Sequence, residues 1–224
     1  MSIFYIFYFI LLISISILFI YIGILRKNAF EERLATFYPY RQLSEKREAY
    51  IRKVSKHNRI MFALLLLPFF VLIYAMLGDD YQEIKGADAE VINHHFLLLL
   101  AALLPVLMLY YIIYYVQQRN KKARRMLLEQ MSDADFELLL RIRDNFFFPY
   151  KYDPPFVLCK KHLYIFLFHT IKEIDPTQII SIKSTRTRNV FLVRIKSPKV
   201  TVFSTSEIGL SLFLQIVGQY TKVE

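Results

Sequence analysis

Few side chains in this sequence are of types that could perform covalent chemistry. Cys159 is the only cysteine, and His162 follows it three residues later. A cysteine nucleophile needs a histidine base and donors for the oxyanion, and no motif supplies the rest of that set. A single cysteine also forms no internal disulfide and no multi-thiolate zinc site. We therefore expect Cys159 to be a small buried residue in a strand, and we expect neither catalysis nor a cofactor.

A second group of chemically capable residues lies in the acidic segment 78–95, which holds five carboxylates and ends in His94 and His95. Carboxylates and imidazoles are metal ligands, but adjacent residues on a helix diverge by about 100° and do not easily share one ion. We expect a solvated acidic loop without a metal. A weak divalent site or a pH-sensitive surface is the alternative.

The densest group of charges is the segment VQQRNKKARR, residues 116–125, in a chain with a net charge of +10. Such a cluster could bind nucleic acid, act as a targeting signal or form a solvated helix face. Its position directly after a charge-free apolar run favours a membrane-proximal collar that contacts anionic lipid headgroups. The collar consists of Arg119, Lys121, Lys122, Arg124 and Arg125.

Three long runs contain no charged side chain, and hydrophobic residues make up 55% of the sequence. The runs cover residues 1–25, 60–77 and 96–116, and about 20 apolar residues cross a hydrocarbon core. The first run lacks the basic start and the cleavage site of a secretory signal, so we expect an uncleaved anchor, with a cleaved signal as the alternative. The sequence thus predicts three transmembrane helices.

The basic residues between these runs predict an orientation. Segment 26–59 carries ten Lys and Arg residues, whereas segment 78–95 carries one. Because cytoplasmic loops are enriched in Lys and Arg, we expect the N-terminus outside and segments 26–59 and 117–144 inside, as long cytoplasmic helical extensions. This pattern predicts a multi-pass protein of the bacterial inner membrane.

The amino-acid composition changes in residues 145–224, where β-branched and aromatic residues replace helix formers. Apolar and polar residues alternate in short runs, for example around Val193 and Ile195, which is typical of strands with one buried face. Thr205 or Ser206 is placed to cap a final amphipathic helix. The sequence predicts a small antiparallel β domain closed by a C-terminal helix, so the fold class is membrane α plus α+β.

The stretches FVLCKKHLYIF, IKEIDPTQIISIK and NVFLV, followed by a terminal helix, resemble small bacterial pleckstrin-homology-like domains. This resemblance implies a binding or assembly module without catalysis. Segment 145–224 carries eleven basic residues against five acids. Those at predicted turns are the candidate contacts for anionic headgroups or an anionic ligand: Lys160, Lys161, Arg186 and Arg188. General attraction to an anionic leaflet is the alternative. Nucleic acid is disfavoured because the aromatic residues follow buried-strand patterns.

Together these patterns predict a non-enzymatic inner-membrane protein whose cytoplasmic β domain binds a protein partner or an anionic ligand. It would act as a sensor or effector subunit, for example in defence, or as an immunity or regulatory protein. The alternative is an oligomeric membrane pore or channel-like subunit. The expected partners are an anionic lipid bilayer, a protein and further copies of the same chain.

Overall fold

The structure is a computed structural model that describes residues 10, 13–18, 21, 28–84, 89–146, 150–188 and 190–220. Within these ranges only the main chain is described for residues 68–69, 72–73, 75–84, 89–103, 105 and 150. The chain divides into two compact units. Unit 1 comprises Met1–Leu25 and Asn58–Gln118, and unit 2 comprises Arg26–His57 and Arg119–Glu224.

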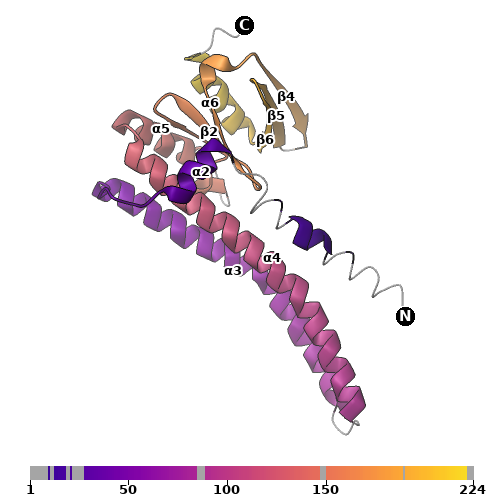
Figure 1. Ribbon diagram of the computed structural model, residues 1–224. Coiled ribbons are helices and arrows are strands. Elements are labelled where there is room, and N and C mark those ends of the chain that lie inside the picture. Colours follow the sequence, from indigo (N-terminus) through magenta and orange to yellow (C-terminus); the bar gives the residue numbers. More distant parts are fainter. Residues whose placement is uncertain are drawn as a thin grey trace. The chain divides into compact units, whose positions relative to one another are not determined.

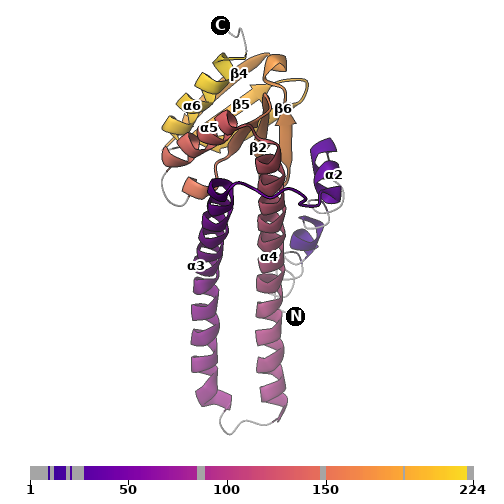
Figure 2. The ribbon, with the colours of Figure 1, turned by 90° about the vertical axis from the view of Figure 1, so that its left-hand side faces the viewer.

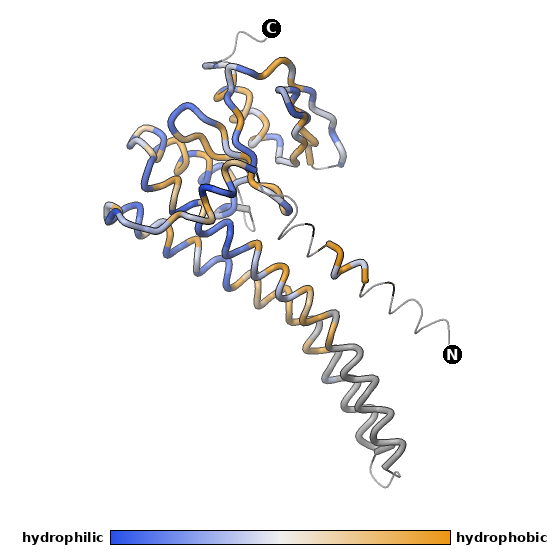
Figure 3. Tube along the Cα trace, viewed as in Figure 1, coloured by the Kyte–Doolittle hydropathy of each residue, from blue (hydrophilic) through white to orange (hydrophobic). Residues whose placement is uncertain are grey.

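Two long helices supply most of unit 1. Helix α3 spans Glu45–Ile84 and helix α4 spans Ala89–Gln130, and the two run side by side (Figures 1 and 2). Inside unit 1 they touch through the rings of Phe62 and Tyr110, whose centroids are 4.7 Å apart. The described part of both helices here is largely apolar, as the colours of Figure 3 show. Many of its side chains are exposed, among them Phe70 at 65% and Leu107 at 61%.

The prediction of three membrane spans is wrong. Within the ranges that the structure describes, no helix is long and apolar enough to cross a membrane. Runs 60–77 and 96–116 are not separate elements, because each is part of a helix of 40 or 42 residues that also has a strongly charged half. Run 1–25 lies mostly outside the described residues. The inner-membrane localisation, the orientation and the membrane keywords depended on these spans and are wrong with them.

Unit 2 begins with short helices whose first residues follow from local chemistry. Helix α2 spans Ala29–Thr36, and the Asn28 side chain accepts a hydrogen bond from the Glu31 N–H. Helix α5 spans Asp133–Asp144 and starts with a capping box, in which Ser132 and Asp135 each accept from the other's backbone N–H. Such side chains satisfy the N–H groups that a helix start leaves without partners.

The rest of unit 2 consists of two antiparallel sheets of three strands each and a closing helix. We name the sheets A and B. The strands of sheet A, in spatial order, are β1 (Phe156–Cys159), β2 (His162–Phe166) and β3 (Ile171–Ile174). Those of sheet B are β4 (Ser181–Thr187), β5 (Val190–Lys196) and β6 (Val200–Thr205). Single 3₁₀ turns, η2 (Tyr150–Tyr152) and η3 (Pro176–Gln178), precede β1 and β4.

Helix α6, Glu207–Gly218, closes unit 2, and the Ser206 side chain caps it by accepting from the Gly209 N–H. Gly209 is at a very close approach. A Cβ atom there would lie 2.6 Å from Cζ of Phe146 and closer still to Oγ1 of Thr205. Any larger residue at this position would therefore force the side chains of Thr205 and Phe146 to move.

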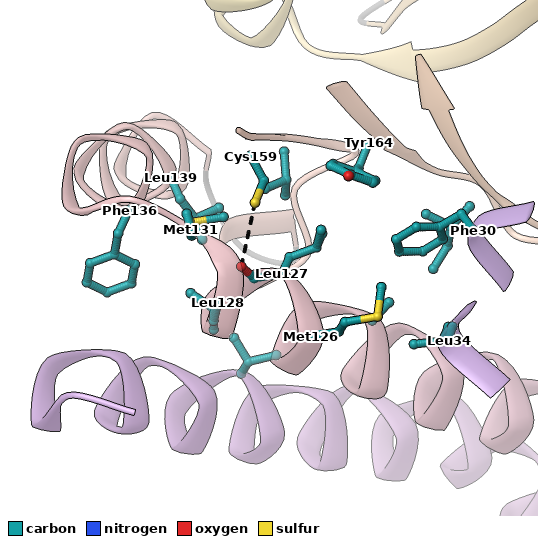
Figure 4. Close-up of a cluster of buried hydrophobic side chains, with 14 of the residues drawn as sticks. Phe30, Leu34, Met126, Leu127, Leu128, Met131, Phe136, Leu139, Cys159 and Tyr164 are labelled. Atoms are coloured by element: carbon teal, nitrogen blue, oxygen red, sulfur yellow. Dashed lines mark hydrogen bonds between the residues drawn. The ribbon is translucent and has the colours of Figure 1, made fainter. Parts of the chain in front are cut away.

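Sheet A is the layer between two apolar cores of unit 2. On one side Val157, Cys159 and Tyr164 join residues of α2, α3, α4 and α5, as Figure 4 shows for this cluster. On the other side Phe156 and Leu163 join sheet B and α6. Because successive strand residues point to opposite faces, all four residues of β1 are buried.

Candidate binding surface

The basic cluster that was predicted to contact lipid headgroups lies on the part of α4 that belongs to unit 2. Arg124 is 4% exposed. Its guanidinium donates to the Tyr152 carbonyl oxygen (3.1 Å), forms an ion pair with Asp153 and lies 5.2 Å from the ring centroid of Phe166. Burial lowers the pKa of Arg124 from its ordinary value, since the charged form loses its hydration. These contacts tie α4 to the segment before β1.

The neighbouring basic residues of α4 also bind protein groups. Arg119 donates to the carbonyl oxygens of Leu167 (2.9 Å) and Phe168 (3.0 Å). Arg125 pairs with Glu48 (2.8 Å) and Glu129 (3.1 Å). Lys122 donates to the Ala35 carbonyl oxygen (3.0 Å), and Lys121 is exposed. Four of the five collar residues thus contact protein groups of unit 2, and the predicted contact of the cluster with lipid headgroups stays a prediction.

The outer edge of β3 is covered by the start of α2. The Asn28 side-chain amide donates to the Ile171 carbonyl oxygen (2.6 Å), and the Ile171 N–H donates to Oε1 of Glu31 (3.1 Å). The same carboxylate lies 3.5 Å from Nη1 of Arg119. Side chains therefore satisfy main-chain groups that an edge strand would otherwise leave open.

The cysteine is poorly placed to act as a nucleophile. Cys159 is 1% exposed, and its thiol donates to the Leu127 carbonyl oxygen at 3.6 Å (Figure 4). Burial, more than any nearby charge, raises the pKa of the thiol to about 12. The thiolate, which is the reactive form, is therefore scarce at neutral pH. The neighbouring His162 faces Glu173 instead, with Nδ1 and Oε1 4.0 Å apart.

Lys160 and Lys161, two of the predicted contact residues, form the two-residue turn between β1 and β2. Both have left-handed backbone angles, with φ of 50° and 67°. Tight hairpins need this conformation, and it strains residues other than Gly, Asn and Asp. The Lys160 N–H donates to Asp135 at the start of α5 (3.1 Å), which holds the turn in place. Both lysines are exposed.

Arg186 and Arg188, the other two, lie at the turn between β4 and β5. Arg188 also has a left-handed φ, 52°, and Arg186 donates to its carbonyl oxygen at 3.4 Å. The Arg186 guanidinium lies 5.8 Å from the ring centroid of Phe191. The lysine pair and the arginine pair therefore belong to turns of different sheets, and no described contact joins them.

A larger basic surface covers the outward face of sheet B, which we call the basic face. The strand register aligns Lys183 with Arg194 and Val202, and Ser181 with Lys196 and Val200. The three basic side chains are exposed. The apolar side chains of this face are also 40–46% exposed: Val190, Leu192, Val200 and Val202. The face therefore combines positive charge with accessible apolar surface.

The positive charge on this face meets no acidic side chain in the part of the chain that the structure describes. Lys183 and Arg194 are direct cross-strand partners, an arrangement that destabilises a sheet. None of the basic residues on this face forms an ion pair with a described acid. Residues 181–205 contain six basic residues and no Asp or Glu. The alternation of residues 193–196 indicates which side chains point outward, but only the register reveals that two positive charges face each other.

The predicted acidic loop between the long helices is mostly helical, since α3 ends at Ile84 and α4 begins at Ala89. The side chains of His94 and His95 lie outside the described residues. Among the side chains that the structure describes, no group of three His, Cys, Asp or Glu residues is placed to hold a metal ion.

No protein-family model, curated protein or solved structure matches this chain. The resemblance to pleckstrin-homology-like domains therefore stays a prediction from sequence.

Proposed function

We propose that this chain is a non-catalytic binding protein and that the basic face of sheet B binds an acidic segment of a protein partner. The observation that carries the proposal is the direct pairing of Lys183 with Arg194, with Lys196 beside them and no described acid in contact. An acidic partner would turn this mutual repulsion into attraction. The exposed valines and Leu192 on the same face supply apolar area for contact.

The surroundings of the chemically capable side chains support a binding role over catalysis. The Cys159 thiol is buried, with a pKa raised to about 12. It makes its hydrogen bond to a main-chain carbonyl, and Nδ1 of His162 lies 4.0 Å from Oε1 of Glu173. A sensor, immunity or regulatory role, as expected from the sequence, would use the same binding surface.

Fluorescence anisotropy with labelled poly-L-glutamate tests the proposal. The full-length chain is compared with the double variant Lys183→Thr/Arg194→Thr, in which threonine preserves strand preference. A matched control, Lys46→Ser/Lys121→Ser, removes two positive charges from exposed helix positions. We expect binding that weakens between about 0.05 M and about 0.5 M salt, and that is lost only in the strand variant. Equal loss in both variants would show that binding depends on net charge alone and would refute the proposal.

A second candidate role is self-association through unit 1, which the exposed apolar side chains favour. Phe70, Tyr74 and Leu107 are 65%, 80% and 61% exposed on neighbouring helices. Large exposed apolar side chains on neighbouring helices favour an interaction site here. Light scattering over a concentration series tests the role. We expect an oligomer that Phe70→Glu/Leu107→Glu dissociates, and a wild-type chain that stays monomeric would exclude it.

A further inference from the structure

Strand β4 is an edge strand that the described part of the chain does not cover. It pairs with β5 on one side only, and every residue from Lys183 to Thr187 is exposed. The edge of β3, by contrast, is covered by Asn28 and Glu31. An exposed edge presents main-chain donors and acceptors in a row, and a second extended chain can pair with them.

The hairpin turn determines which main-chain groups face outward. Thr187 and Val190 are partners on either side of a two-residue turn, so they form a hydrogen-bonded pair. The pattern alternates along the strand, and Lys183 and Thr185 therefore also bond to β5. The N–H and C=O groups of Ile182, Ser184 and Arg186 consequently point to the open edge.

The positive charges of β4 and β5 favour one kind of chain as the added strand at this edge. Strand β4 itself carries Lys183 and Arg186, and the adjacent β5 carries Arg194 and Lys196. A second copy of β4 would bring the same positive charges alongside, which is unfavourable. Nucleic acid is less well matched, because the exposed apolar side chains of the basic face are valine and leucine, which do not stack on bases as aromatic rings do. An extended segment with alternating carboxylates fits both the main chain and the charges.

We propose that an acidic, extended segment of a partner protein binds by adding a strand to the open edge of β4. This inference rests on the proposed function and specifies its geometry. The segment forms main-chain hydrogen bonds with Ile182, Ser184 and Arg186. Every second side chain of the segment is acidic and lies on the same side of the sheet as the basic face, beside Lys183 and one strand away from Arg194. The β4–β5 hairpin and its two-residue turn stay unchanged.

The test uses the full-length chain and a blocked octapeptide of alternating threonine and glutamate. A second peptide has the same sequence, but the amide nitrogens that would face β4 are methylated, so it keeps its charge and loses its donors. On the protein side Ser184→Pro removes one outward N–H, a position where an edge strand tolerates proline. Ser184→Ala is the matched control. Hydrogen exchange of the outward amides of Ile182, Ser184 and Arg186 is measured in the wild-type chain.

We expect the unmodified peptide to slow exchange at the three outward amides. We also expect the methylated peptide, and separately the Ser184→Pro variant, to weaken binding by about tenfold or more, since each removes main-chain hydrogen bonds. Ser184→Ala should bind as the wild type does. Equal affinity for both peptides would overturn strand addition but leave the acidic-partner function standing. Absence of binding by either peptide, with no binding of poly-L-glutamate, would overturn both, and a β4-mediated dimer would overturn strand addition alone.

Discussion

The buried thiol of Cys159 makes the stability of unit 2 depend on pH in a calculable way. Its pKa is raised from an ordinary value of 9.0 to about 12, chiefly because burial disfavours the thiolate. A group with a raised folded-state pKa stabilises the fold fully below its unfolded pKa, and this contribution is lost as pH rises toward the folded pKa. The loss therefore begins near pH 9. At pH 10 the loss amounts to about 1.4 kcal/mol. In the unfolded chain the thiolate outnumbers the thiol about tenfold at this pH, whereas the folded thiol stays almost entirely protonated.

Urea unfolding followed by circular dichroism at pH 8 and pH 10 measures this loss, with Cys159→Ala as the reference. Tyr50 and Tyr164 also have raised pKa values, mainly through burial, so both proteins lose stability in alkali. The difference between wild type and variant isolates the thiol. We expect this difference in unfolding free energy to shrink by about 1.4 kcal/mol between the two pH values. If the difference in unfolding free energy between wild type and variant were the same at both pH values, the reasoning would be refuted, since the folded thiol would then ionise as an exposed one does.

Three further changes test the packing and capping of unit 2 by urea unfolding. Gly209→Ala should destabilise unit 2 by about 1–3 kcal/mol through overpacking. Gly218→Ala, with open space around its Cβ position, should be neutral or stabilising by about 0.5–1 kcal/mol. Equal effects of the two changes would contradict the close packing of Phe146 and Thr205 against Gly209. Ser132→Ala should cost about 1 kcal/mol by removing the capping box of α5, and Ser132→Asp should restore most of it; no loss on Ser132→Ala would show that the cap is dispensable. Glu31→Ala should cost about 2–3 kcal/mol, because it leaves a buried N–H of β3 without a partner. Glu32→Ala, at an exposed position of the same helix, should change stability by less than about 0.5 kcal/mol. Similar losses for both variants would argue that Glu31 does not cover the edge of β3.

Local features of this fold could be predicted from the sequence. Ser206 caps α6 as expected, and Asn28 and Ser132 cap α2 and α5 in the same way, because the capping interaction involves only residues two or three positions apart. The alternation of apolar and polar residues in β5 matches its pattern of buried and exposed side chains for the same reason. Both signals come from residues that are close together in the sequence, so they can be recognised without knowledge of the tertiary structure.

Interactions between distant segments could not be predicted in this way. Arg124 lies 29 positions from Asp153 and forms an ion pair with it, and no local pattern indicates that pairing. A charge cluster next to an apolar run has the same appearance whether it contacts lipid or the protein interior. The register of β4 could not be predicted either, because a turn predicted near Arg186 and Arg188 does not specify that Thr187 and Val190 are partners.

The net charge of +10 therefore says little about function until the charged residues are grouped by what each of them contacts. On α4 the cations of Arg119, Arg124 and Arg125 meet carboxylates and carbonyl oxygens of the same unit, so they stabilise the fold and leave little charge for a ligand. On sheet B, Lys183 and Arg194 meet each other. A fold that supplies internal partners for one set of cations and places another set in mutual repulsion leaves the second set to an external anion. The mutual repulsion on sheet B, rather than the total charge, is thus the observation that supports the proposed acidic partner.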